Sequence, residues 1–226
     1  MKKICIWVLF LSHLILTHQY QYTLAVDLPE VILDPFFYKC IAGRIHFHIA
    51  SALILPYSST NDFALAMVYA KQAGFSNVHL LVDPMEFVTA DPTTVVENMQ
   101  ASLMSKGINV QGVWISVFQN SSAWQISPDA NVRMINNILS AFSAALPQTS
   151  RFGFFTTYSD WIAITDGATS LASGHFYWSA WGDSIPPPNT CNGYNIKGFS
   201  NCYFQQIRVG NNACGYLYNL NVLRPF

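Results

Sequence analysis

Residues 112–118 read Gly-Val-Trp-Ile-Ser-Val-Phe, a short run of β-branched and aromatic residues. A helix-forming stretch that ends at Gly107 precedes this run, and another that opens at Ser127-Pro128 follows it. A short apolar segment between two helical segments is typical of a buried strand in a parallel sheet. Residues 113–117 are therefore predicted to form one strand of an α/β fold.

The same alternation continues in both directions along the chain. Helices are predicted over residues 63–71, 93–106 and 128–145, because a capping oxygen, an early proline or a terminal glycine marks their ends. After residue 165 the helical signal fades and loop-forming residues take over. The predicted strands are 23–28, 45–52, 78–82, 113–117, 152–156, 176–181, 203–207 and 217–222. Eight strands favour a compact barrel over an open sheet, helical in its first half and loop-rich in its second.

The amino terminus is predicted to be a secretory signal. Lys2 and Lys3 precede an apolar stretch of about a dozen residues, which is too short for a membrane span of about 20. We assign residues 1–20 to a signal peptide, with the cleavage site between Thr17 and Tyr22, and residues 21–226 to a single domain. No second run could span a bilayer, so we expect a secreted, extracellular protein. An uncleaved signal anchor is the alternative.

The charge balance argues against nucleic-acid binding. The chain has 11 basic and 12 acidic residues, and removal of Lys2 and Lys3 leaves 9 against 12, a net charge of −3. Proteins that bind nucleic acid usually carry the opposite balance, with clustered basic residues. We therefore expect no nucleic-acid partner and, with no sign of an oligomer, a monomer.

Four cysteines remain once Cys5 is assigned to the signal: Cys40, Cys191, Cys202 and Cys214. An even number in an exported chain predicts two disulfides with three possible pairings. The bond between Cys191 and Cys202 closes an Asn/Gly-rich loop and is the easiest local pair. Cys40 and Cys214 would then form the second bond and tie the two ends of the domain together. A zinc site is a weaker alternative because no pair has the spacing typical of zinc ligands.

Several stretches, in order along nearly the whole predicted domain, resemble glycoside hydrolase family 25 lysozymes, especially their divergent nematode and amoeba branch. These stretches are Ala25-Val26-Asp27-Leu28, Ala73-Gly74-Phe75-Ser76-Asn77-Val78, Gly112-Val113-Trp114-Ile115, Phe152-Gly153-Phe154-Phe155, Tyr177-Trp178-Ser179-Ala180-Trp181 and Leu220-Asn221-Val222. The resemblance implies an irregular (β/α)8-type, TIM-like barrel with its cleft at the carboxyl ends of the strands, and muramidase ancestry.

The catalytic carboxylates of that family are missing. Glycoside hydrolysis uses two carboxyl groups, and the family carries an Asp-x-Glu pair on its fourth strand. Here the two positions are Ser116 and Phe118, and the carboxylate expected on the last strand is replaced by Asn219. Neither Ser nor Phe can hold the proton or the charge, so we expect little or no hydrolysis. Asp27 survives, either as a cleft residue that contacts sugar or water, or as a capping or turn carboxylate.

Two other carboxylates could substitute for the missing pair. Asp83 and Glu86 follow the third strand, where the resemblance places the rim of the cleft. The competing interpretation is that Asp83-Pro84 forms a turn and Glu86 is a solvated loop residue.

His46 and His48 alternate on the second strand but have no third ligand nearby, so no metal and no cofactor is expected.

The rim also carries candidate contacts for a glycan. Tyr158, Tyr177, Trp181 and Asp183 lie around the ends of the fifth and sixth strands, where aromatic rings could stack on sugars. Burial in the core is the competing interpretation for these rings, since alternate residues of a barrel strand face inward. Asn120 begins the glycosylation sequon Asn120-Ser121-Ser122 on the same rim.

These observations lead to three hypotheses of function. The first is a secreted, lysozyme-like protein without catalysis, with a defence role through bacterial cell-wall glycan or another carbohydrate. The second is an active peptidoglycan muramidase that uses Asp27 with Asp83 or Glu86. The third is a protein-interaction scaffold. Fold alone cannot separate the three.

Overall fold

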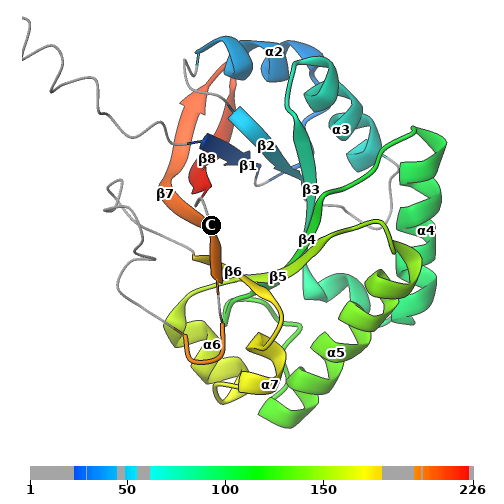
Figure 1. Ribbon diagram of the computed structural model, residues 1–226, viewed down its shortest axis with the longest axis vertical. Coiled ribbons are helices and arrows are strands. Elements are labelled where there is room, and N and C mark those ends of the chain that lie inside the picture. The colour runs from blue at the N-terminus through cyan, green and yellow to red at the C-terminus, as the bar shows by residue number, and fades with distance from the viewer. Residues whose placement is uncertain are drawn as a thin grey trace, which may run out of the picture.

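The computed structural model describes residues 23–28, 30–44, 49–54, 62–179, 196–199 and 201–223, as one curled sheet with helices on its outer side (Figure 1). Eight strands follow one another in chain order around this sheet. They are β1 Thr23–Asp27, β2 Ile49–Ile54, β3 Asn77–Val82, β4 Gly112–Val117, β5 Arg151–Thr156, β6 Phe176–Ser179, β7 Asn201–Ala213 and β8 Tyr216–Leu223. The predicted α/β class is confirmed.

The first seven strands pair in parallel, whereas β8 is antiparallel both to β7 and to β1. The sheet closes through these two antiparallel pairs, so it departs from the regular repeat of parallel strands and helices. The β7–β8 hairpin accounts for this difference, because two strands joined by a tight turn must run in opposite directions.

The helical elements are α2 Pro35–Arg44, α3 Asp62–Gln72, the 3-10 helix η1 Pro84–Phe87, α4 Pro92–Ser105, α5 Pro128–Ala145, α6 Tyr158–Thr165 and α7 Thr169–Ala172. Three of them, α3, α4 and α5, lie where the capping signals predict helices. At the start of α4 the Asp91 carboxylate accepts the backbone N–H of Thr94, as expected of a helix cap. Four of these elements, α2, η1, α6 and α7, were not predicted from the sequence.

Within the described residues the predicted strand 45–52 is observed at Ile49–Ile54, so it extends two residues beyond its predicted end. Residues 45–48, and with them His46 and His48, lie outside the described part of the chain. The loop-rich second half is interrupted by the short helices α6 and α7, and α6 begins where the Thr157 hydroxyl accepts the N–H of Asp160. None of the described helices has the length and apolarity needed to cross a membrane.

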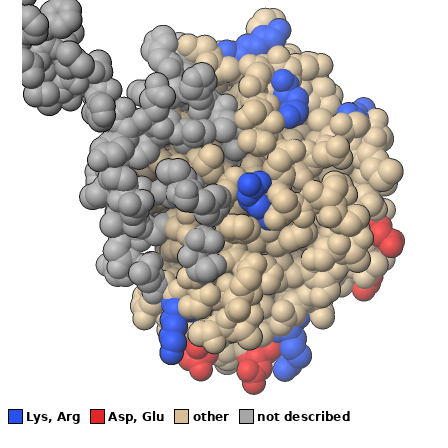
Figure 2. Space-filling model, viewed as in Figure 1, with Lys and Arg blue, Asp and Glu red and all other residues tan. Residues whose placement is uncertain are grey.

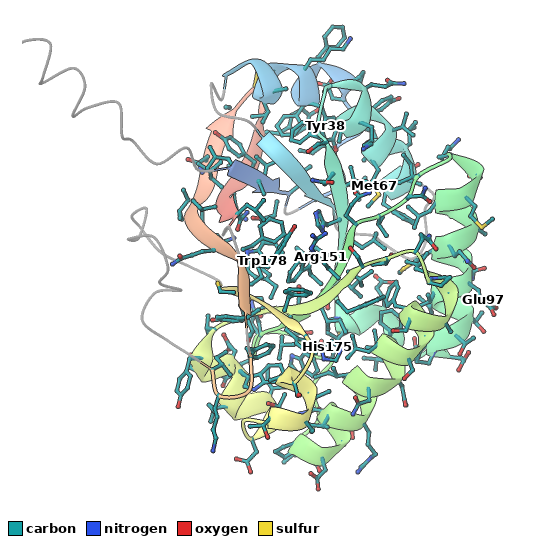
Figure 3. All side chains as sticks on the ribbon, viewed as in Figure 1. Tyr38, Met67, Glu97, Arg151, His175 and Trp178 are labelled. Atoms are coloured by element: carbon teal, nitrogen blue, oxygen red, sulfur yellow. A yellow bond between two sulfur atoms is a disulfide. The ribbon has the colours of Figure 1, made fainter. Side chains whose placement is uncertain are left out.

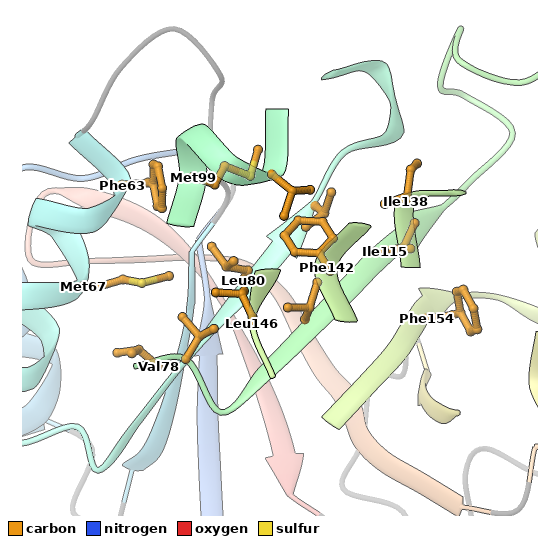
Figure 4. Packing of buried hydrophobic residues seen from close by; sticks show 14 of the residues in the cluster. Phe63, Met67, Val78, Leu80, Met99, Ile115, Ile138, Phe142, Leu146 and Phe154 are labelled. Carbon is orange, nitrogen blue, oxygen red and sulfur yellow. The ribbon is translucent and has the colours of Figure 1, made fainter. Parts of the chain in front are cut away.

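Successive strand residues face two different cores. Val113, Ile115 and Val117 of β4 belong to the large cluster between the sheet and the helices, part of which is shown in Figure 4. Trp114 faces the other way and packs inside the ring of strands with Trp178. The other members of this interior cluster are Ala25, Leu81, Phe155, Tyr203 and Phe204. The interior is therefore filled largely by aromatic rings.

A disulfide joins Cys40 of α2 to Cys214, in the turn between β7 and β8. The bond connects residues 174 positions apart and ties the start of the domain to its end, which is one of the pairings that the sequence left open. Cys202 is also disulfide-bonded, and its predicted partner Cys191 lies outside the described residues.

Candidate functional site

Asp27 lies at the carboxyl end of β1 and is almost completely buried. Its carboxylate accepts hydrogen bonds from three side-chain amides: Asn221 Nδ2 at 2.6 Å, Asn219 Nδ2 at 2.7 Å and Gln206 Nε2 at 3.4 Å. The antiparallel register of β1 and β8 sets Asn219 directly opposite Asp27. The side chain is thus held by amides of β7 and β8 and does not cap a turn.

Burial raises the pKa of the Asp27 carboxyl, and the amide hydrogen bonds act in the opposite direction. The amides are themselves held in place. Asn221 Oδ1 accepts the indole N–H of Trp178 at 2.8 Å, and Asn219 Oδ1 accepts the backbone N–H of Gly210 at the same distance. Because the oxygens of Asn221 and Asn219 accept these hydrogen bonds, the NH2 group of each of these two amides points at the carboxylate.

Ser116 and Phe118, the two positions at which the sequence analysis expects the catalytic pair of the family, lie at the carboxyl end of β4. The ring of Phe118 packs edge-on against Phe155 with centroids 4.9 Å apart, and Phe155 stacks on Trp178 at 3.8 Å. Ser116 is half-buried on the same face of β4 as Trp114. An apolar ring therefore occupies the position where the sequence analysis expects the glutamate of the family.

The candidate substitutes lie in the segment after β3. Asp83 Oδ1 accepts the backbone N–H of Met85 at 3.0 Å and caps η1, as the turn interpretation predicts. Glu86 lies within η1 and is half-buried. The capping role of Asp83 engages one of its two carboxylate oxygens.

The aromatic candidates are divided between two layers. Tyr177 is buried in the cluster between the sheet and the helices, where its hydroxyl donates to the Thr156 carbonyl at 3.4 Å and its ring packs near Phe199. Its neighbour Trp178 takes the inward position instead (Figure 3). Tyr158 is exposed at the start of α6, whereas Trp181 and Asp183 lie outside the described residues.

A polar group that the sequence analysis missed lies inside the ring of strands toward its amino-terminal end. His79 of β3 is fully buried, and its Nδ1 accepts the indole N–H of Trp114 at 3.3 Å. Burial, with a smaller contribution from Arg151, lowers the pKa of His79 to about 3. Arg151 lies 4.8 Å over the ring of Tyr203 (Figure 3). One indication of this buried polar group was present in the sequence, a histidine within the otherwise apolar run 78–82.

Metal-binding geometry is lacking in the part of the chain that the structure describes, where no cluster of three or more His, Cys, Asp or Glu side chains occurs. Charged side chains are scattered over the face seen in Figure 2. Asn120, the sequon residue, is exposed in the turn after β4.

The family model for lysozyme-like protein 1 matches residues 18–200. This chain belongs to that lysozyme-like family. Lysozyme-like protein 7 of Caenorhabditis elegans is 25% identical over 126 residues, which cover 53% of this chain and 43% of the relative. The matched part therefore covers less than half the length of that relative.

Solved structures show the same fold as this lysozyme-like protein. A bacterial lysozyme from Streptomyces coelicolor superposes with a TM-score of 0.61 at 14% identity, covering 92% of this chain and 94% of its own. A muramidase from Trichobolus zukalii gives a TM-score of 0.61 at 14% identity, covering 90% and 94%. The resemblance to the family 25 lysozymes is confirmed. At this identity the superpositions establish the fold alone.

Proposed function

We propose that this lysozyme-like protein is a secreted protein with a degenerate (β/α)8-type barrel that binds cell-wall glycan without hydrolysing it. The proposal rests on one observation, the packing of Phe118 against Phe155 where the family has its catalytic glutamate. General acid–base catalysis contributes roughly 10²–10⁴-fold per group, and neither Ser116 nor Phe118 can supply it.

The carboxylate that remains is poorly placed for catalysis. Asp27 accepts three amide hydrogen bonds and is buried, so its oxygens are already engaged. A retaining or inverting glycosidase needs a second carboxyl about 5–9.5 Å away. Asp83 is engaged in capping η1, which supports the non-catalytic proposal.

The test compares hydrolysis with binding on the same substrate. Purified protein is incubated with peptidoglycan, reducing sugar is measured, and the walls are then sedimented to measure bound protein. We expect binding with no release of reducing sugar. Release that disappears in Asp83→Asn or Glu86→Gln, but persists in Glu97→Gln on the exposed face of α4, would overturn the proposal in favour of an active muramidase. Absence of both binding and release would favour an interaction scaffold.

Secretion and a role in defence are part of the same proposal. The basic and apolar residues of positions 1–20 support a cleaved signal, and the exposed position of Asn120 supports glycosylation. Expression in a eukaryotic secretory host should yield extracellular protein whose first residue lies between positions 17 and 23. Treatment with an N-glycosidase should lower its mass, and Asn120→Gln should abolish that shift. Retention of the protein in cells would contradict secretion.

A further inference from the structure

A groove of about 470 Å³ lies where η1, the segment between β4 and α5, and α5 meet. Phe87, Trp124 and Met134 form apolar parts of its wall, and Gln125, Arg133 and Asn137 contribute polar groups. None of its lining residues belongs to the Asp27 network or to the rings inside the strands. The groove is therefore separate from the site that the family uses for hydrolysis.

The segment that forms one wall is held rigidly. The indole N–H of Trp124 donates to the Phe118 carbonyl at 2.7 Å. The buried side chain of Asn131 accepts the N–H of Gln125 at 2.7 Å and donates to its carbonyl at 2.9 Å. Farther back, Asp160 of α6 accepts both the backbone and the side-chain N–H of Gln119. A wall fixed at these points is preformed, so a ligand would not have to order it.

The polar groups of the groove are available to a ligand. Within the described ranges, no hydrogen bond or ion pair engages the Arg133 guanidinium or the side-chain amides of Gln125 and Asn137. None of the lining residues carries a carboxylate, so Arg133 supplies the only formal charge in the lining. Guanidinium groups bind carboxylates with two parallel hydrogen bonds, whereas amides suit hydroxyl and N-acetyl groups.

The dimensions of the groove fit a small ligand. Its volume falls within the range of about 300–1,000 Å³ typical of small-molecule sites, which combine apolar walls with a few converging polar groups. A sugar ring offers an apolar C–H face to aromatic and thioether side chains and hydroxyls to amides. A carboxylate on the ring would complement Arg133.

We infer that this groove binds a sugar that carries a carboxylate. The inference rests on the proposed function and extends it, because it names an acidic sugar as the recognised unit and places it outside the ancestral cleft. Recognition here needs no contribution from Asp27 or from the β4 positions. A protein that has lost its catalytic pair could thus still select an acidic glycan.

The test titrates the full mature protein with N-acetylmuramic acid, and with N-acetylglucosamine as the probe that lacks the carboxylate. We expect the acid to bind about tenfold more tightly than the neutral sugar, a ratio typical of one charge-assisted contact. Arg133→Gln should abolish this preference and leave binding of the neutral sugar unchanged. Lys106→Gln, which removes an exposed cation at the opposite end of α4, should keep the preference.

A second variant tests the groove without altering charge. Ala130→Phe places a large ring at a half-exposed groove position and should weaken binding of both sugars. Circular dichroism of each variant establishes that it is folded. Equal affinity of the wild type for the two sugars, no measurable binding of the acid, or an unchanged preference in Arg133→Gln would overturn the inference.

The two proposals can fail separately. Retention on cell walls without Arg133-dependent binding of the soluble acid would overturn the groove and leave the wall-binding proposal standing. Tight binding of the soluble acid, lost in Arg133→Gln, together with no retention on walls would support the groove and overturn wall binding.

Discussion

The buried imidazole of His79 should make the stability of this protein depend steeply on pH. In the folded chain the pKa of His79 is lowered to about 3, against an ordinary value of 6.5. The unfolded chain therefore takes up a proton between these two values that the folded chain excludes. The free energy of unfolding is fully retained above about pH 6.5 and falls as the pH drops toward 3.

The size of this loss follows from the distance between the two pKa values. One pKa unit corresponds to about 1.36 kcal/mol, so at pH 4.5, two units below the unfolded value, His79 should cost about 2.7 kcal/mol. The full difference, reached below pH 3, is about 5 kcal/mol. Such a loss is a large fraction of the about 5–15 kcal/mol that stabilises a typical domain.

His79→Asn isolates this contribution. The Asn side chain can offer an acceptor near the position of Nδ1 to the indole N–H of Trp114, but it does not titrate. Subtraction of the variant from the wild type also cancels the contribution of Asp27. That contribution has the opposite sign, because a raised carboxyl pKa makes the folded state gain stability as the pH falls.

The assay is urea unfolding of both proteins at pH 7.5 and pH 4.5, followed by tryptophan fluorescence. Between these values the wild type should lose about 2.7 kcal/mol more than His79→Asn. As an independent readout, the imidazole NMR signals of His79 should not titrate between pH 7.5 and 4.5 in the folded protein. Equal losses in the two proteins, or an imidazole that titrates near pH 6.5, would refute this reasoning.

Three further changes should lower stability, each measured by urea unfolding at pH 7.5. Gly112→Ala should destabilise by about 1–3 kcal/mol, because the new Cβ would lie 2.6 Å from Nδ1 of His79; an unchanged midpoint would contradict this crowding. Asn221→Leu should cost about 1–3 kcal/mol, because the buried Asp27 carboxyl loses an amide donor and the indole N–H of Trp178 loses its acceptor; unfolding at the wild-type urea concentration would refute this. Cys40→Ala should cost about 2–5 kcal/mol, and the difference should vanish when both proteins are measured under reducing conditions.

Local patterns predicted much of the secondary structure. The limits of α4 and α5 follow from Asp91-Pro92 and Ser127-Pro128, since capping and proline geometry depend on neighbouring residues only. Most strands could be predicted because apolar β-branched runs leave few alternatives. The helix α6 was missed because its first turn depends on Thr157 and Asp160, polar residues that also occur in loops.

Local patterns did not predict which side chains of a strand face the interior of the barrel and which face the helices. Alternation shows that Tyr177 and Trp178 face opposite sides, but it does not say which side is the interior. The structure settles this through strand pairing, which aligns Phe155 with Trp178 and leaves Tyr177 against the helices. For this reason the interpretation of Tyr177 as a cleft residue was wrong, and the interpretation as a core residue was right.

Residue types and their order in the sequence were enough to predict the α/β class, to limit four cysteines to three possible pairings, and to show that Ser116 and Phe118 carry no carboxylate. These conclusions depend on residue type and local order. The tertiary structure alone decided what Asp27 does, because its amide partners lie 179 to 194 positions away in the chain. The burial of His79 and the groove beside Arg133 have the same origin. Each arises where segments distant in sequence pack together, and only the closed sheet brings those segments into contact.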